Sequence, residues 1–403
     1  MLDLKSIKKA QERLNGVIHH TPFSYAPILS EITNYKVYLK KENLQRTGAF
    51  KLRGAFNKIA SLIEAGKRGG VVAASAGNHA QGVAFSAKYF NIEATIVMPD
   101  STPLNKIQGV KEFGAKVILH GANYDEAYSY AIKYTKENNL EFVHPFTDDE
   151  VISGQGTIAI EMLEVEPNLD AIIVPVGGGG LISGIGIATN AINPKTKIIG
   201  VASAGAPAMK ESYDTKEAHG TQSVRTIADG IAVRDASPIT LEHILKEVDS
   251  LELVCEDEIA SAILFLLEKQ KLLVEGAGAV GVAALLHNKI PLEKGSKIGI
   301  VLSGGNIDVT MLSLIIEKGL VKSSRKMKLS VIMVDKPGSL MAFTDLLTKV
   351  GANIVHIGYD RTSTDLEFGD AVVSVHLETK GVEHQEEVRN ILRKENFIFK
   401  ELR

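Results

Sequence analysis

A single lysine, Lys51, is notable for its neighbours. It lies between Phe50 and Leu52, directly after the small residues Thr47-Gly48-Ala49 and at the start of a helical pattern. Lysine is normally solvated, and an amine held among apolar side chains loses hydration, which lowers its pKa and makes it more nucleophilic. Such an amine can form a Schiff base with an aldehyde, and pyridoxal phosphate is the common aldehyde cofactor. Lys51 is therefore a candidate Schiff-base lysine if the chain also supplies a phosphate cradle and a carboxylate pocket. Otherwise it is a surface lysine at a helix start.

Four consecutive glycines, Gly177, Gly178, Gly179 and Gly180, are candidates for binding a phosphate group. They follow the apolar, β-branched stretch 171–176, which predicts a buried strand, and they precede a helical pattern. Glycines here let successive backbone N–H groups point into one concavity, and the N-terminus of the following helix adds partial positive charge. A flexible turn is the alternative, but four glycines cost considerable chain entropy. We therefore interpret the run as a phosphate cradle.

Two further strand ends carry polar side chains. Ser75-Ala76-Gly77-Asn78-His79 follows the predicted strand 70–74 and opens a helix. Exposed N–H groups and small polar side chains at such a junction suit a substrate carboxylate, although a simple helix cap is the alternative and His79 alone would be a structural histidine. Ser303 follows the predicted strand 297–302, where its hydroxyl could hydrogen-bond a neutral pyridine nitrogen or serve only in a turn.

One motif suggests a different cofactor. Residues 276–281 match G-x-G-x-x-G, the dinucleotide fingerprint, and residues 272–274 would be its strand. The fingerprint needs an acidic residue at the end of a second strand about 20 positions further on. The nearest candidate, Glu293, lies in a Pro-Leu-Glu-Lys-Gly turn, which argues against a nicotinamide enzyme. No metal-ligand spacing, P-loop or nucleophile elbow is found, so no metal site is predicted.

Composition limits the classes of protein. A chain of 403 residues predicts two or three domains, and 45% apolar with 23% charged residues is typical of a globular protein. The net charge of −3 without a basic stripe argues against nucleic acid as a partner. No apolar run reaches membrane length, the N-terminus lacks a signal-peptide pattern, and the single cysteine, Cys255, excludes an intrachain disulfide. These features predict a cytoplasmic protein with no membrane partner.

Strand and helix patterns alternate along most of the chain, which predicts an α/β fold with a parallel sheet covered on both faces. The predicted strands are 37–40, 70–74, 94–98, 116–119, 171–176, 198–201 and 297–302. The predicted helices are 1–15, 50–65, 78–89, 103–113, 123–138, 149–164, 180 onward, 240–247, 257–271 and 277–288. Residues 205–237 are rich in Gly, Ala and Pro and predict an irregular region near a site.

The character of the sequence changes near residue 318. Lysine and arginine punctuate residues 318–328, which indicates a linker. After it, the order of strand and helix patterns is βαββαβ, the ferredoxin-like arrangement. The predicted strands are 329–334, 353–359, 370–377 and 396–401, and the predicted helices run to 350 and over 382–394.

Taken together and in order, the motifs resemble those of the threonine dehydratases (threonine ammonia-lyases), in the tryptophan synthase β-like group of pyridoxal phosphate enzymes. The resemblance covers about residues 1–320 and rests on five motifs: Gly48–Gly54, Ser75–His79, Gly177–Gly180, Glu275–Ala279 and Ser303–Asn306. The tail resembles an ACT domain, a small amino-acid-sensing module, through Asp335–Leu340 and Gly351–Ile354. The resemblance implies a two-lobed catalytic domain of fold type II over 1–322, with a smaller lobe at roughly 50–150, a linker at 323–328 and an ACT domain at 329–403.

The resemblance also implies roles for individual residues. Lys51 would carry the cofactor and shuttle the Cα proton, and Phe50 would pack against the cofactor ring. Asn78 would hydrogen-bond the ring 3-oxygen, and Ser303 would face the pyridine nitrogen. The remaining cofactor residues would be Gly177, Gly178, Gly179 and Gly180 at the phosphate, together with Glu275. The substrate carboxylate would be bound by the stretch Ser75, Ala76, Gly77, Asn78 and His79.

The implied reaction converts L-threonine to 2-oxobutanoate and ammonia, and L-serine to pyruvate. Alternatives of the same chemistry are a serine dehydratase, a 3-hydroxyaspartate ammonia-lyase and a β-replacement enzyme such as cysteine synthase. An alternative of another class is an amino-acid sensor with an inactive large unit. A role in isoleucine biosynthesis and a catabolic role both stay open.

Two positions depart from related families. Similar serine racemases have a serine acid/base where this chain has Ala76, which argues against racemisation. Related enzymes also bind a divalent cation through a glutamate, which follows the strand after the glycine run. The corresponding stretch here, Val201–Pro207, contains no carboxylate, so that metal site is not predicted.

The ACT-like tail implies regulation by an amino acid bound between paired small domains. Exposed N–H groups of a loop shaped by Pro337 and Gly338 would take the effector carboxylate, although a plain surface turn is the alternative. Isoleucine, valine, or a nucleotide on the large unit, are open as effectors, and pairing would give a homodimer or homotetramer. The residues expected to contribute are Asp335, Pro337, Gly338, Ser339, Leu340 and Asn353.

Overall fold

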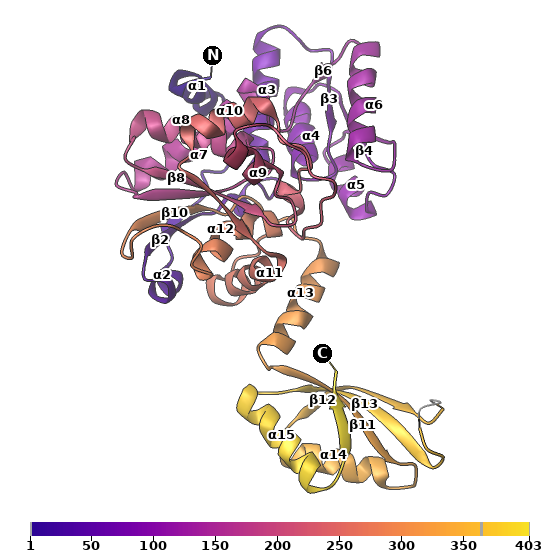
Figure 1. Ribbon diagram of the computed structural model, residues 1–403. Helices are drawn as coiled ribbons and strands as arrows, with labels where there is room; N and C mark the ends of the chain where they lie inside the picture. The colour runs from indigo at the N-terminus through magenta and orange to yellow at the C-terminus, as the bar shows by residue number, and fades with distance from the viewer. Residues whose placement is uncertain (1, 363–365, 403) are drawn as a thin grey trace. The chain divides into compact units, whose positions relative to one another are not determined.

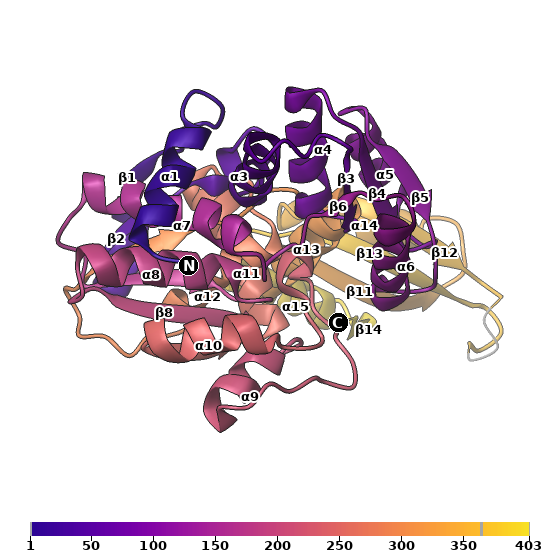
Figure 2. The same ribbon diagram turned by 90° about the horizontal axis from the view of Figure 1, so that it is seen from above.

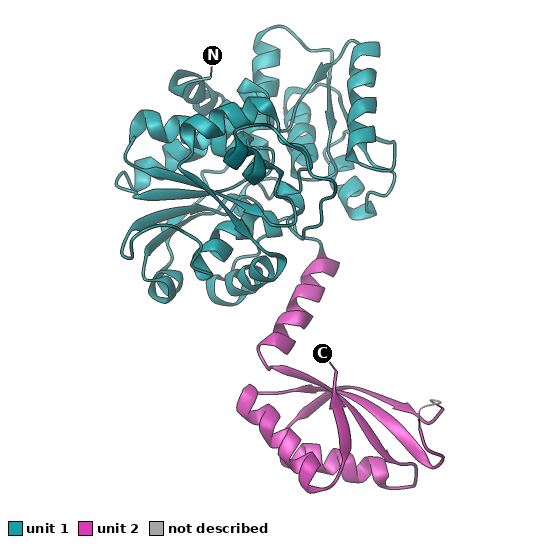
Figure 3. Cartoon of the chain, viewed as in Figure 1, with its two compact units in different colours: residues 1–308 teal, residues 309–403 magenta. Residues whose placement is uncertain are grey.

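The computed structural model describes residues 2–362 and 366–402, which form two compact units (Figure 3). The first unit spans 1–308 and the second 309–403. Met1 and Arg403, the outer limits of the expected domains, lie outside the described residues. The division falls before the predicted boundary at 322, so helix α13 (Val309–Lys322) groups with the second unit. Residues 326–328, expected in the linker, instead begin strand β11, because Met327 is buried in the core of that unit.

The larger sheet of the first unit has six strands in the order β1-β2-β10-β7-β8-β9, and only the pairing of β1 with β2 is antiparallel. Its strands are β1 (Phe23–Tyr25), β2 (Lys36–Lys40), β7 (Ala171–Pro175), β8 (Lys197–Ser203), β9 (Ser250–Val254) and β10 (Lys297–Val301). The central strand β7 is buried throughout, as expected for a parallel strand with helices on both faces. One face is covered by α7 (Asp149–Val165), α8 (Gly180–Ile192) and α10 (Pro238–Glu247), and the other by α11 (Glu256–Phe265) and α12 (Gly276–Leu286) (Figures 1 and 2).

A second, smaller sheet forms the other lobe of this unit. Its four parallel strands lie in the order β5-β4-β3-β6 and are β3 (Val71–Ala74), β4 (Ala94–Met98), β5 (Lys116–Leu119) and β6 (Glu141–Phe142). Around it pack α3 (Lys51–Glu64), α4 (Asn78–Phe90), α5 (Leu104–Lys111) and α6 (Tyr124–Glu137). The expected α/β class and its two lobes are therefore confirmed, with two parallel sheets.

Helix α7 joins two helices that begin at predicted site motifs. A Cβ on Gly154 of α7 would lie 2.5 Å from the Arg53 carbonyl oxygen of α3, so the two backbones cross in close contact. Two residues further along α7, a Cβ on Gly156 would lie 2.7 Å from the Gly184 carbonyl oxygen of α8. Only glycine permits such approaches. Helix α3 begins at Lys51 and α8 at Gly180, so one helix fixes the relative position of the lysine and the glycine run.

Some elements were not predicted from the sequence. They are α2 (Pro27–Thr33), α9 (Ala208–Thr215), β1, β6, β9 and α13. Helix α9 lies inside the segment expected to be irregular, so that part of the interpretation of 205–237 was wrong. Residues 272–274, the possible strand of the dinucleotide fingerprint, form no strand; they follow a π-helical turn and lead into α12.

The second unit contains the predicted βαββαβ order. Its antiparallel sheet has the strand order β12-β13-β11-β14, and α14 and α15 follow β11 and β13. The elements are β11 (Lys326–Val334), α14 (Ser339–Lys349), β12 (Asn353–Asp360), β13 (Asp370–Glu378), α15 (Val382–Lys394) and β14 (Ile398–Glu401), and α13 directly precedes them in the sequence. Helix α1 (Leu4–Leu14) belongs to the first unit. Alternate residues of β11 and β13 are buried, as expected for strands with one covered face. The arrangement is consistent with an ACT domain.

Candidate active site

Lys51 is the first residue of α3, and its amine lies in a partly buried position between the two lobes. Its Nζ donates to the Pro145 carbonyl oxygen at 2.9 Å and lies 5.3 Å from the centre of the Phe50 ring. Burial lowers the pKa of this amine from 10.5 to about 8, against a smaller opposing effect of the Glu275 carboxylate. The neutral, nucleophilic form of the amine is therefore accessible near neutral pH.

This pKa leads to a testable expectation for the protein without cofactor. Only the neutral form of an amine is acylated, so a lowered pKa moves the labelling of Lys51 to lower pH. We expect the rate of acetylation of Lys51, followed by peptide mass spectrometry, to rise with pH through a midpoint near 8. Lys349 is an exposed lysine whose pKa is raised by its hydrogen-bonded ion pair with Asp345, so it should be acetylated only at higher pH in the same sample. A common midpoint for both lysines would contradict the assignment.

The glycine run follows β7 and opens α8, as its sequence predicts. A Cβ on Gly178 would lie 2.4 Å from the Phe146 ring, and a Cβ on Gly180 would lie 2.7 Å from the Phe146 carbonyl oxygen. Gly179 adopts φ +88°, the left-handed region, and a Cβ there would lie 2.8 Å from Cβ of Thr240. Side chains at these positions would collide with Phe146 and Thr240, so the loop can keep this shape only with glycine. The first N–H groups of α8 have no partner within the helix and carry the positive end of its dipole, which suits a phosphate.

The segment after β6 connects the lysine and the glycine run. Pro145 accepts the hydrogen bond from Lys51, and the next residue, Phe146, packs on the glycines. His144 accepts hydrogen bonds at Nδ1 from the Phe146 and Thr147 backbone N–H groups, which holds this segment in its turn. Burial and the nearby Lys51 charge lower the pKa of His144 to about 4, so the imidazole is neutral. Sequence reasoning missed these residues, because no spacing in the sequence relates 143–147 to Lys51.

A second group of polar side chains gathers around Asn78, at the start of α4. Its Nδ2 donates to Glu275 Oε1 at 2.8 Å, and its Oδ1 accepts from Asn306 Nδ2 at 2.8 Å. Asn306 also donates to the Thr47 carbonyl oxygen at 2.8 Å. Burial raises the pKa of Glu275, while the Asn78 hydrogen bond partly opposes that shift. Asn78 and Glu275, both predicted for the cofactor site, are thus in direct contact, and Asn306 joins them.

Ser303 lies at the end of β10, as predicted, and is buried. Its carbonyl oxygen accepts the Phe50 N–H at 3.0 Å, so the residue before Lys51 is hydrogen-bonded to the larger sheet. An isolated bridge between Ala49 and Gly304 continues this contact. The strand end that carries Ser303 and the start of α3 are therefore adjacent.

The Ser75–His79 stretch opens α4, with Gly77 as its N-cap residue. The Ser75 hydroxyl accepts the Gly77 N–H at 3.2 Å, and Ala76 has no side-chain polar atom. The His79 imidazole is buried and its Nε2 pairs with the Val143 carbonyl oxygen at 2.9 Å. Burial, with a smaller effect of Lys51, lowers the pKa of His79 to about 3. The imidazole is thus hydrogen-bonded within the smaller lobe, which leaves the backbone N–H groups in the first turn of α4 as the candidates for binding a carboxylate.

The stretch Val201–Pro207 has no carboxylate of its own, but one reaches it from α11. Glu256 accepts from the Ser203 hydroxyl at 2.8 Å and from the Ile227 N–H at 2.6 Å. It thereby fixes the segment that packs on Gly276, where a Cβ would lie 2.5 Å from the Ile227 carbonyl oxygen. Among the described residues, no group of three or more His, Cys, Asp or Glu is arranged to hold a metal ion.

These residues fit pyridoxal phosphate. The nucleophilic amine of Lys51, a glycine loop with no room for side chains, and the polar residues Asn78 and Ser303 lie on neighbouring segments. The family model of pyridoxal-phosphate dependent enzymes matches residues 14–304. The chain belongs to this family. Pyridoxal phosphate is accordingly the cofactor of the enzyme, as its sequence motifs predict.

Similar proteins narrow the class of this pyridoxal-phosphate enzyme. Two proteins named L-threonine ammonia-lyase, from Thermotoga maritima and Geobacter sulfurreducens, are 48% and 45% identical to it, over 97% and 96% of either chain. Solved structures of maize serine racemase and of processed threonine deaminase isoform 2 from Solanum lycopersicum each match with a TM-score of 0.74 at 36% identity. These two matches cover 79% and 78% of the enzyme, and 98% and 87% of the matched chains.

Proposed function

We propose that this enzyme is a pyridoxal-phosphate-dependent L-threonine ammonia-lyase, which forms 2-oxobutanoate and ammonia from L-threonine and pyruvate and ammonia from L-serine. The observation that carries the proposal is the partly buried Lys51 amine beside the glycine cradle, in a chain 48% identical over almost its whole length to an L-threonine ammonia-lyase. No helix of the described residues is long and apolar enough to cross a membrane.

Each group has a role in this proposal. When bound, pyridoxal phosphate withdraws electrons from the substrate Cα. Gly177–Gly180 would hold its phosphate, Phe50 would pack on its ring, and Asn78, supported by Glu275, would bind its 3-oxygen. The hydroxyl of the buried Ser303 would meet the pyridine nitrogen and, being neutral, would leave that nitrogen less electron-withdrawing than a carboxylate partner would.

Lys51 is the acid/base of the reaction. Its Nζ takes the substrate Cα proton in the neutral form that the lowered pKa makes available. The Cβ–O bond breaks and the β-hydroxyl leaves as water, with one proton equivalent to the one that Lys51 removes from Cα, and the released enamine hydrolyses to the 2-oxo acid and ammonia. Backbone N–H groups at the start of α4 and the Ser75 hydroxyl hold the substrate carboxylate, which keeps the Cα–H bond facing Lys51.

Ala76 favours the lyase over a racemase. Racemisation needs a second acid/base on the opposite side of Cα, and the side chain at 76 has no group that can transfer a proton. The enzyme therefore has the fold of maize serine racemase but no proton-transferring group at position 76.

Steady-state assays with different substrates test the proposed activity. We expect L-threonine to give 2-oxobutanoate and ammonia in equal amounts, L-serine to give pyruvate, and neither to give measurable D-isomer. Assays of 3-hydroxyaspartate, and of O-acetylserine with sulfide, address the alternative activities. Faster turnover of either of these than of threonine would contradict the proposal.

We further propose that the second unit binds an amino-acid effector, and that it pairs with a second copy in a homodimer or homotetramer. A cavity of about 440 Å³ lies beside the start of α14 and includes Lys336, Gly338 and Ser339 of the predicted loop. Asp335 is instead paired with Tyr359 and Arg361, and Asn353 donates to Glu378 at 2.7 Å. These polar contacts leave the N–H groups at the start of α14 as the place for a carboxylate.

Filling this cavity tests the regulatory proposal. Ala342 lies at the cavity wall, one turn into α14. We expect Ala342→Trp to abolish any change of rate caused by isoleucine or valine, while kcat without effector stays within about twofold because the first unit is unaltered. Glu387→Trp, at an exposed position on α15, is the control. An effector response that survives in Ala342→Trp would contradict this site.

A further inference from the structure

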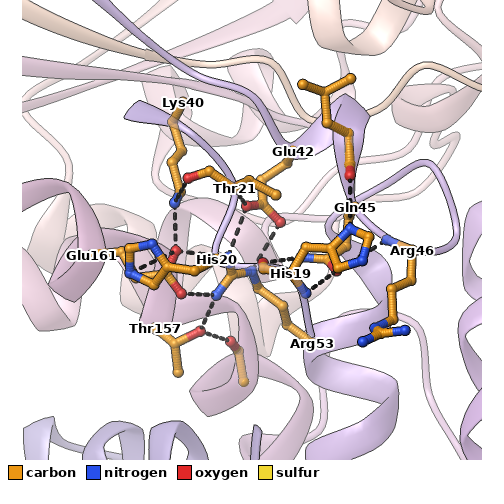
Figure 4. Close-up of polar contacts among 12 residues, drawn as sticks. His19, His20, Thr21, Lys40, Glu42, Gln45, Arg46, Arg53, Thr157 and Glu161 are labelled. Carbon is orange, nitrogen blue, oxygen red and sulfur yellow. Dashed lines mark hydrogen bonds and ion pairs between the residues drawn. The ribbon is translucent and has the colours of Figure 1, made fainter. Parts of the chain in front are cut away.

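The first unit contains a group of buried charges that the proposed reaction does not use (Figure 4). At its centre is Arg53, which is fully buried and lies two residues after Lys51. Its Nε and Nη2 donate to Glu42 at 2.9 and 2.8 Å, and its Nη1 and Nη2 donate to Glu161 at 2.6 and 2.9 Å. Lys40, also fully buried, is paired with Glu161. Two cations and two anions therefore neutralise one another in the interior.

These residues come from four separate parts of the unit. Lys40 ends strand β2 of the larger sheet, and Glu42 lies in the 3₁₀ turn that follows it. Glu161 lies on α7, one turn after Thr157, whose hydroxyl oxygen accepts from Arg53 at 3.0 Å. Arg53 is thus the side chain through which α3 is connected to both β2 and α7. Its five donors in a planar fork suit two carboxylates at once, which a lysine ammonium cannot reproduce.

The start of α3 has no side-chain cap, although the Phe50 N–H is hydrogen-bonded to the Ser303 carbonyl oxygen. Phe50 is its N-cap residue and provides no side-chain hydrogen bond. Successive residues of an α-helix are about 100° apart around its axis, so Lys51 and Arg53 point about 200° apart. The lysine therefore faces the junction of the lobes from one side of the first turn, while the ion-paired arginine holds the opposite side.

We propose that Arg53 is a positioning residue for Lys51, and that its paired carboxylates set the location of the lysine amine by fixing the first turn of α3. The effect is one of position, because the arginine charge is neutralised by Glu42 and Glu161 and adds little field at Lys51. Displacement of a reacting group by about 1 Å can reduce a rate by about 100-fold. The inference rests on the proposed role of Lys51 as the acid/base.

The test replaces the planar guanidinium group of Arg53 by the ammonium group of lysine, in the full-length enzyme with its cofactor. We expect Arg53→Lys to lower kcat for threonine by about 10-fold to 100-fold and to leave KM within about threefold, because the carboxylate and phosphate sites are untouched. Hydrogen exchange should become faster in the peptide that covers residues 50–57 and unchanged in peptides from β7 and α8. Kinetics are measured well below the melting temperature of each variant.

Two further variants make the result specific. Glu161→Gln keeps the shape of the side chain and one acceptor, and it should show the same loss of kcat and the same faster exchange in residues 50–57. This variant provides the test if Arg53→Lys does not fold. Arg13→Lys is the matched control, because Arg13 of α1 also forks between two carboxylates, Glu64 at the last residue of α3 and Glu150 in the first turn of α7. We expect the control to melt at a lower temperature with kcat unchanged.

A purely structural role for Arg53 would give a different pattern. In that case Arg53→Lys and Glu161→Gln would melt at lower temperature, exchange would rise in all peptides, and kcat would equal that of the parent; this outcome overturns the proposal. Failure of the proposed function is distinguishable, since the parent enzyme would then not turn over threonine, whereas the exchange of residues 50–57 still reports whether Arg53 fixes the first turn.

Discussion

Replacing Lys51 by alanine is expected to reduce threonine turnover by about 1,000-fold or more, because the variant loses both the attachment point of the cofactor and the base that removes the Cα proton. The visible absorption of the lysine-bound cofactor should disappear as well. The fold should persist, since the amine makes a single hydrogen bond, to Pro145, and its removal relieves a burial penalty. Production of 2-oxobutanoate and circular dichroism measure the two effects.

Lys58→Ala is the matched control for this variant. Lys58 lies two turns further along the same helix, where it pairs with Asp148 at 2.6 Å, away from the glycine run. We expect it to retain turnover and the visible band. Borohydride reduction of the parent enzyme followed by peptide mapping should place the cofactor on residue 51. Attachment to another lysine would refute the assignment.

The second large effect is expected from Gly179→Ala in the phosphate cradle. Alanine pays about 1–2 kcal/mol for the left-handed backbone at φ +88°, and overpacking against Thr240 and Ile244 adds about 1–3 kcal/mol. The free energy of unfolding should therefore fall by about 2–5 kcal/mol. Because the new methyl group displaces the cradle, we also expect the dissociation constant for pyridoxal phosphate to rise by about 10-fold or more, a loss of about 1.4 kcal/mol. Denaturant unfolding and cofactor titration measure the two quantities.

Gly295→Ala separates the backbone cost from the crowding. Gly295 has nearly the same φ, +91°, but no atom lies within 4 Å of its would-be Cβ. We expect this variant to lose only about 1–2 kcal/mol of stability and to bind pyridoxal phosphate as the parent does. Equal cofactor affinity in Gly179→Ala and Gly295→Ala would show that the loop does not contact the phosphate.

Local patterns predicted the parts of the fold that depend on neighbours in sequence. The β-branched stretch before the four glycines forms β7, and the glycines open α8, because a buried parallel strand and a helix start both have short sequence signals. Helix α9 was missed because eight residues in a Gly- and Pro-rich segment carry too little periodicity. The βαββαβ order of the tail was predicted from its succession of strand and helix patterns, of which β11 and β13 alternate clearly.

The residues of the site also separate into those with a local sequence signal and those without one. Lys51, Asn78, Glu275 and Ser303 are at strand ends or helix starts, and the motifs locate them. Pro145, which accepts the lysine hydrogen bond, and Asn306, which supports Asn78, come from loops whose approach depends on tertiary packing. Arg53 is the strongest case. Charged residues are usually exposed, and no local pattern shows that this one is fully buried between two carboxylates.

The close backbone crossings of α7 bear on how substrate reaches the amine. Side chains normally let packed helices slide by changing rotamer, but at Gly54–Gly154 and Gly156–Gly184 the main chains of two helices approach each other with no glycine side chain between them. No glycine side chain can change rotamer at these contacts, so α3, α7 and α8 are expected to move as one body. A movement of the four-stranded sheet relative to α7 and α8 would therefore have to bend the chain beyond α3, and Lys51 and the glycine run would keep their relative positions.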